Sequence, residues 1–136
     1  MKVALSLLIC FLLLLPASAQ QASTFTAHFQ AGAPVTKDAN VQVTLTFRLY
    51  NSTGDNVRGA TVKLIPPYAS IPVYATFSEV AVAPGESIVL TQSVTVPQRE
   101  FARWQTSGPK LALEYYNADG QKVGRLISAK AVAGAL

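Results

Sequence analysis

Cysteine and histidine are almost absent from this 136-residue sequence, which contains one residue of each. The cysteine, Cys10, lies in an apolar run near the N-terminus, so the chain beyond that run has no thiol and no disulfide. A zinc site needs several cysteine or histidine ligands, and a nucleophilic residue needs a base that a third group orients. We therefore expect no metal site, no cofactor and no catalytic residue, and we predict that the protein is not an enzyme.

Acidic residues are also few, and the seven Asp and Glu residues are dispersed along the chain. Asp55, Glu86 and Asp119 lie in segments that are predicted to be turns. No spacing indicates a glycosidase-like pair of carboxylates, although a pair across two strands stays open. The sequence also lacks a glycine-rich phosphate loop and a nucleophile elbow. The one histidine, His28, alternates with apolar neighbours, so we expect it to face solvent.

Blocks of positive charge are missing as well. Of the 11 Lys and Arg residues one is Lys2, and without it ten basic and seven acidic residues leave a net charge of about +3. The basic residues are scattered and form no stripe on a predicted helix, as a nucleic-acid site would require. We interpret the mild positive charge as a solvated surface and expect no nucleic-acid partner.

The one long hydrophobic run is at the N-terminus, over residues 3–15. A lysine precedes this run, a proline follows it, and Ala17-Ser18-Ala19 forms a small-x-small cleavage site. These features are typical of a secretory signal peptide, and the run is too short for a membrane span. We predict that residues 1–19 are a signal peptide cleaved between Ala19 and Gln20. The protein is then secreted or periplasmic, with no stable membrane span after cleavage.

Removing 19 of the 136 residues leaves 117, which is the size of one domain, residues 20–136. Small exported domains often rely on disulfides, and their absence here favours the bacterial envelope or secreted fraction. Asn51-Ser52-Thr53 is an acceptor triplet for N-glycosylation in a eukaryotic secretory pathway. In a bacterium the same triplet is a turn, so the sequence leaves open whether Asn51 is glycosylated.

Alternation of apolar and polar residues dominates the rest of the chain. Between Val41 and Leu49 every odd-numbered residue is apolar and every even-numbered residue is polar, which is typical of a half-buried strand. Residues 88–96 alternate in the same way, and Gln92 is the one polar residue on their apolar side. In the segment near the C-terminus, Tyr115 is expected in the core and Tyr116 at the surface. Alternation predicts strands at 25–29, 41–49, 60–64, 88–96, 111–115 and 123–132.

Turn residues separate these segments, and a helical spacing interrupts them once. Pro84-Gly85-Glu86-Ser87 predicts a tight turn, and residues 117–120 predict a short hairpin loop. Phe101 and Trp104 are spaced i, i+3, which predicts a short helical turn near 98–105 with both rings on one side and Trp104 in the core. Short strands with such turns indicate an all-β fold, an immunoglobulin-like antiparallel β-sandwich of about seven strands.

Two blocks of sequence carry a resemblance to a known family. Thr44-Leu45-Thr46-Phe47-Arg48-Leu49-Tyr50-Asn51 leads through a polar loop to Gly59-Ala60-Thr61-Val62. Val82-Ala83-Pro84-Gly85-Glu86-Ser87 is followed by an alternating strand that ends at Val96-Pro97. This pattern, over roughly residues 41–97, resembles the bacterial immunoglobulin-like accessory domains of the cell-adhesion-related, CARDB-type group. The resemblance implies the fold only, because such sandwiches host unrelated activities.

Tyrosines in a proline-interrupted segment indicate where partners bind. Residues 66–74 contain three prolines, which lack backbone donors, so this segment must lie at a sheet edge or in a loop. Tyr68, Ile71 and Tyr74 are then available to a partner, since tyrosine suits interfaces that are partly wet. We predict that these three residues form the binding site. The alternative is an extended loop whose rings cover the sheet.

These observations predict an exported, non-enzymatic binding or structural module that makes protein–protein contacts in the bacterial envelope or secreted fraction. We expect the partner to be another envelope or extracellular protein. Two alternatives stay open. A carbohydrate-binding module would take a glycan on exposed aromatic side chains, and a subunit of a surface fibre would use an edge strand for β-strand addition.

Overall fold

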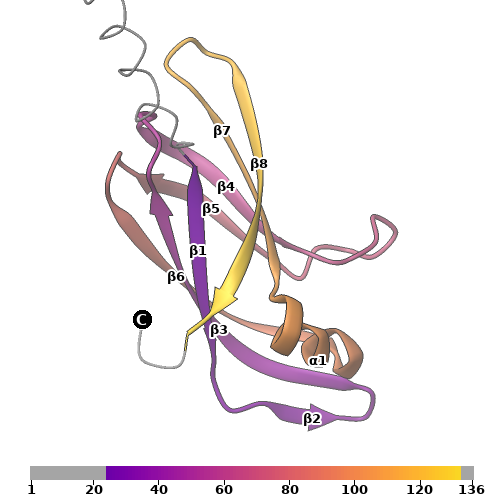
Figure 1. Cartoon of the computed structure of the whole chain (residues 1–136). Coiled ribbons are helices and arrows are strands. Elements are labelled where there is room, and N and C mark those ends of the chain that lie inside the picture. The colour runs from indigo at the N-terminus through magenta and orange to yellow at the C-terminus, as the bar shows by residue number, and fades with distance from the viewer. Residues whose placement is uncertain (1–23, 133–136) are drawn as a thin grey trace, which may run out of the picture.

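The computed structural model describes residues 24–132, and these residues form β-strands with one helix (Figure 1). The predicted signal peptide, its cleavage site and Cys10 lie outside the described residues. Within 24–132, no helix combines the length and the apolar character that a membrane crossing requires. The elements are β1 (Phe25–Ala31), β2 (Val35–Lys37), β3 (Asn40–Asn51), β4 (Val57–Ile65), β5 (Ala75–Val82), β6 (Ser87–Pro97), α1 (Gln98–Ser107), β7 (Lys110–Tyr116) and β8 (Lys122–Ala131).

All eight strands belong to one hydrogen-bonded sheet, in the order β2-β3-β1-β8-β7-β4-β5, with β6 on the other side of β3. β8 connects the two halves of this sheet. Its first part pairs antiparallel with β7 along 122–128, and its last part pairs parallel with β1 through Ala129 and Ala131. One half therefore contains β1, β2, β3 and β6, and the other contains β4, β5 and β7.

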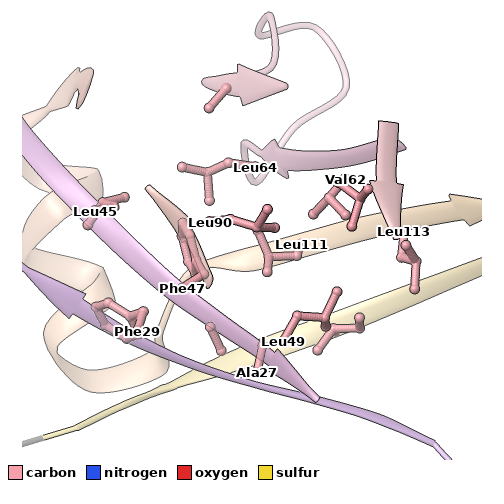
Figure 2. Packing of buried hydrophobic residues seen from close by; sticks show 14 of the residues in the cluster. Ala27, Phe29, Leu45, Phe47, Leu49, Val62, Leu64, Leu90, Leu111 and Leu113 are labelled. Carbon is pink, nitrogen blue, oxygen red and sulfur yellow. The ribbon is translucent and has the colours of Figure 1, made fainter. Parts of the chain in front are cut away.

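The sheet curls so that its two halves face each other across a shared core. Phe47 on β3 lies edge to face with Phe77 on β5, with ring centroids 6.3 Å apart. Phe25 on β1 meets Tyr115 on β7 in the same way, at 5.8 Å. Figure 2 shows side chains from both halves converging, with Phe47 and Leu49 on one side and Leu111 and Leu113 on the other. Burial of this apolar surface is the main stabilising contribution.

The predicted alternation in β3 corresponds to its burial. Val41, Val43, Leu45, Phe47 and Leu49 are all at most 4% exposed, and the intervening residues face away from the core. In β7 Tyr115 is 2% exposed and Tyr116 is 66% exposed, as the alternation predicts. His28 on β1 is exposed.

The all-β class and the short helix are confirmed. The helix extends over Gln98–Ser107, slightly longer than the predicted turn near 98–105. The eight strands are one more than the about seven expected of a sandwich. Because β8 joins the two halves into one curled sheet, the immunoglobulin-like sandwich stays a prediction. β2 and β5 were not among the predicted strands.

A buried asparagine closes one end of the sheet. The Asn51 side chain is fully buried, and its Nδ2 donates to the backbone oxygens of Asp55, at 2.8 Å, and Val82, at 3.0 Å. Its Oδ1 accepts from the Thr53 backbone nitrogen at 2.9 Å and from the Thr53 hydroxyl. Asn51 thus joins the end of β3 to the following loop and to the end of β5. Nearby, the Tyr115 hydroxyl donates to the Asp55 carboxylate at 2.6 Å; burial and this bond raise the pKa of Tyr115 to about 12.

Candidate interaction groove

A groove of about 530 Å³ lies between the loop that connects β4 to β5 and the helix α1. We call it the tyrosine groove. The loop contributes Tyr68, Ile71 and Tyr74, and the helix with the residue before it contributes a proline and three charged residues. The lining residues are Pro67, Tyr68, Ile71, Tyr74, Pro97, Arg99, Glu100 and Arg103.

Two backbone hydrogen bonds shape the loop. The Tyr74 nitrogen donates to the Leu64 oxygen at 2.9 Å, which anchors the loop where β5 begins. The Ile71 nitrogen donates to the Tyr68 oxygen at 3.2 Å and forms a turn at the tip. Because the prolines interrupt backbone pairing, no strand forms between β4 and β5. The expectation of an edge or loop position for residues 66–74 is confirmed.

The floor of the groove is a stack of aromatic rings. Tyr74 packs edge to face against Trp104 with ring centroids 5.9 Å apart, and Phe101 packs edge to face against Trp104 at 6.3 Å. Trp104 is 1% exposed, so the prediction that it belongs to the core is confirmed. Burial raises the pKa of the Tyr74 hydroxyl above its usual value, the Glu100 carboxylate adds to this, and Arg103 offsets part of it. Tyr74 is therefore neutral, and its ring packs against the core.

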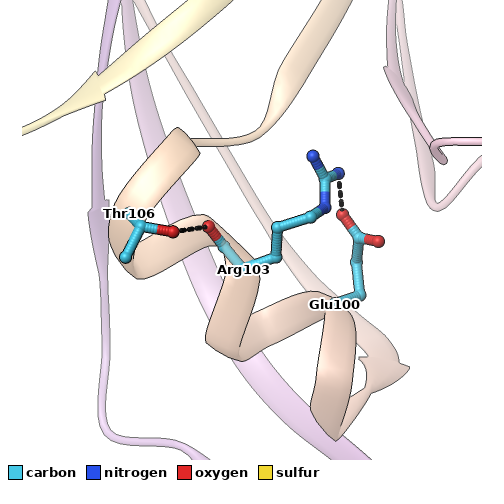
Figure 3. A network of polar contacts seen from close by, with 3 residues as sticks. All are labelled: Glu100, Arg103 and Thr106. Carbon is cyan, nitrogen blue, oxygen red and sulfur yellow. Dashed lines mark hydrogen bonds and ion pairs between the residues drawn. The ribbon is translucent and has the colours of Figure 1, made fainter.

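One wall of the groove is an ion pair on α1. The Arg103 guanidinium donates to the Glu100 carboxylate, and Thr106 donates from its hydroxyl to the Arg103 backbone oxygen at 3.1 Å (Figure 3). Glu100 is 6% exposed, and a carboxylate this deeply buried requires a partner of opposite charge. The charges of this pair compensate each other, so the exposed Arg99 leaves the groove weakly positive.

The structure brings all three predicted site residues to one groove but exposes them unequally. Tyr68 is 67% exposed and Ile71 is 36% exposed, whereas Tyr74 is half-buried. Tyr74 packs against Trp104 of α1, whereas the Tyr68 ring is exposed to solvent. The sequence did not identify Arg99, Glu100 and Arg103 as part of the same groove.

Other chemistry is sparse in the described part of the chain. No group of three His, Cys, Asp or Glu side chains among residues 24–132 is arranged to hold a metal ion. A smaller hollow of about 290 Å³ lies between β1 and β8, beside His28, Leu126 and Lys130. His28 has no carboxylate partner there, since its neighbours in the hollow are apolar, hydroxyl or basic.

No protein-family model and no curated protein matches the chain. One solved structure similar to it is an inactive mutant of a GH20 exo-β-N-acetylglucosaminidase from Vibrio harveyi, with 11% sequence identity and a TM-score of 0.46. The alignment covers 83% of this chain and 19% of that protein, so the chain spans about a fifth of its length. A likeness of this strength carries no inference about activity.

Proposed function

We propose that the protein is an exported, non-enzymatic binding module whose tyrosine groove holds an extended apolar segment of another envelope or extracellular protein. The observation that carries the proposal is the contrast between the two tyrosines. Tyr68 is 67% exposed, whereas Tyr74, which lines the same groove, is packed against Trp104. Aromatic side chains are enriched at the centre of protein interfaces, where they fill well-packed pockets.

The physical properties of the groove support a peptide-like partner. Tyrosine offers a large contact area at a low cost in side-chain entropy, and the packed floor needs no rearrangement on binding. Pro67 and Pro97 add rigid apolar surface on either side. Grooves of aromatic and proline side chains favour extended segments, because such segments lose little conformational entropy. Arg99 at the rim favours a partner segment that has an acidic residue beside its apolar part.

The test compares two tyrosines of equal exposure. Tyr68→Ala removes the exposed ring of the groove, and Tyr116→Ala removes a ring that is 66% exposed at the end of β7. The exported protein is cross-linked in its native envelope and captured, and the recovered partner is quantified. We expect Tyr68→Ala to lower capture at least tenfold, and Tyr116→Ala to leave it unchanged. Equal capture by wild type and Tyr68→Ala contradicts the proposal.

Tyr74→Ala is a poor test of binding, because Tyr74 contributes to the packing around Trp104. The same two variants, Tyr68→Ala and Tyr116→Ala, distinguish a glycan ligand from a protein partner. Binding to a glycan array that only Tyr68→Ala abolishes would replace the protein partner with a glycan at the same groove.

A further inference from the structure

Three strands leave an edge of the sheet unpaired within residues 24–132. β2, β5 and β6 each pair with a single strand, whereas the other five strands have two or more neighbours. An unpaired edge presents a row of backbone donors and acceptors to any extended segment, and monomeric proteins usually protect it. The three edges differ in how well they are protected.

β2 and β5 carry the usual protection. β2 is three residues long, follows Pro34 and ends at Lys37, so it offers little backbone and places a charge at its end. The pairing of β5 with β4 shifts register twice, and Glu79 in β5 is exposed and has a φ of 55°. A bulged strand with a charge at the bulge pairs poorly with a second strand.

β6 lacks the short length, the charge and the bulge that protect the other two edges. Its 11 residues pair with β3 in one uninterrupted register, from Tyr50 opposite Ser87 to Asn40 opposite Pro97. No residue from Ser87 to Val96 is charged, and the only proline is the last residue of the strand. A long, regular, uncharged edge of this kind pairs readily with another strand.

We propose that β6 pairs antiparallel with β6 of a second copy of this chain, on a two-fold axis at Gln92. The chemistry of the strand favours a second copy because β6 is complementary to itself. On the side that faces the core, this register places Ile88 opposite Val96 and Leu90 opposite Val94 of the other copy. Directly opposed apolar side chains stabilise a sheet.

The outer side of β6 is complementary to itself in the same register. Thr91 lies opposite Ser93 of the second copy, and Val89, which is 45% exposed, lies opposite Thr95. Hydroxyl and β-branched side chains form favourable pairs across strands. Because none of these residues is charged, two copies approach along β6 without local repulsion.

Gln92 gives the register its centre. It points to the core side of β6 but is only half-buried, whereas Leu45 opposite it on β3 is fully buried. Among the described residues, the Gln92 amide makes no side-chain hydrogen bond. An amide carries both donors and an acceptor, so two glutamines related by a two-fold axis bond each other reciprocally. The pair explains a polar residue in an otherwise apolar row.

The proposed assembly stops at two copies. Both copies use the same edge strand, β6, in the contact, so neither has a free β6 edge left. The protected edges of β2 and β5 offer no second site at which a third copy could add. The product is therefore a dimer with a sheet that continues through both copies. This assembly differs from a surface fibre, in which each copy would use two different edges.

A cross-linking experiment tests the register. Gln92→Cys in a Cys10→Ser background places its two thiols directly opposite each other, with Cβ atoms about 5 Å apart, so a disulfide should form under mild oxidation. Val89→Cys in the same background is the control. Its two thiols would be six residues apart along the strands, about 20 Å, and should remain unlinked. The readout is the dimer band of the exported protein on a non-reducing gel.

A charge on the edge tests the association itself. By sedimentation equilibrium we expect wild type to dimerise reversibly and Ser93→Lys to weaken the dimer at least tenfold, because it brings two ammonium groups close together. Thr44→Lys is the matched control, since Thr44 is exposed directly beside Ser93 but one strand inside the edge. Monomers at all concentrations, open-ended polymers, a dimer that Ser93→Lys leaves intact, or cross-linking at Val89 and not at Gln92 would each overturn the proposal.

Discussion

At the scale of single residues, Asn51 shows how one polar side chain fixes several segments. Its amide group uses both hydrogens on backbone oxygens and its oxygen on Thr53, so every polar atom of a fully buried side chain has a partner. The acceptor asparagine of the glycosylation triplet is therefore buried in the folded protein, whereas Ser52 beside it is exposed. The amide nitrogen has no hydrogen left for solvent, and any glycan would have to be attached before folding.

Asn51→Asp should be strongly destabilising. A carboxylate has no hydrogen to donate, so the oxygens of Asp55 and Val82 would face a negative charge inside the fold. We expect a loss of about 3 kcal/mol or more in the free energy of unfolding. The matched control is Asn117→Asp, because Asn117 uses mainly its Oδ1, which accepts from the nitrogens of Asp119 and Gln121. Urea unfolding measures both; equal midpoints would contradict this account of Asn51.

At the scale of elements, the alternation of polarity located the strands that are regular. The strand β3 was predicted because its buried residues are all odd-numbered from Val41 to Leu49. The strand β5 was missed because its buried residues change from the odd-numbered Ala75 to the even-numbered Val80 and Val82, with Glu79 at positive φ between them. A bulge inserts one residue and reverses the alternation. β2 is exposed throughout, so its sequence has no alternation to detect.

The end of α1 depends on a glycine, Gly108, that leads from the helix to β7 and lies against β8. Gly108 has φ 69° and ψ 156°, a backbone region almost limited to glycine, and its nitrogen donates to the Trp104 oxygen at 3.1 Å. A Cβ at this position would lie 2.0 Å from the Ala129 oxygen. The backbone at residue 108 therefore lies so close to the part of β8 that pairs with β1 that only a residue without a side chain fits there.

Gly108→Ala should destabilise the protein far more than Gly85→Ala. Gly85 also has a positive φ, of 77°, but an added Cβ meets no atom within 4 Å, so only backbone strain of about 1–2 kcal/mol is expected. Gly108→Ala adds the clash with β8 and should cost at least about 2 kcal/mol more. Thermal unfolding of the two variants measures the clash with β8 together with the greater backbone strain at Gly108. A similar loss of Tm in both would show that β8 moves away without penalty.

At the scale of the whole molecule, the tyrosine groove could not be predicted without knowledge of the fold. The prolines and tyrosines of the 66–74 loop were visible in the sequence, but the helix that completes the groove lies about 30 residues further along, as Tyr74 and Trp104 show. The spacing of Phe101 and Trp104 predicted the helix, but nothing in the sequence placed Glu100 and Arg103 beside the loop. Only the crossing of the loop and the helix shows that Glu100 and Arg103 form a wall.

Export is the property of the whole chain on which the proposed function depends. We expect mass spectrometry of the exported protein to show Gln20 as the first residue. Ala19→Arg should leave the precursor uncleaved, because the position before the cut must be small. Ser18→Arg is the control, since the middle position of the small-x-small site tolerates larger side chains. Retention of residues 1–19 in the exported wild type would contradict the predicted localisation.

The dual pairing of β8 has a kinetic consequence. Ala129 pairs with Ala27, which precedes it by 102 residues (129 less 27), and the same strand pairs with β7. Contacts between such distant parts of a chain form late and slow folding, because a long loop must close first. The hydrogen-bonded connection between the two halves of the sheet can form only after the last strand has been synthesised. If the chain is exported as predicted, slow folding would prolong the unfolded state that transport across a membrane requires.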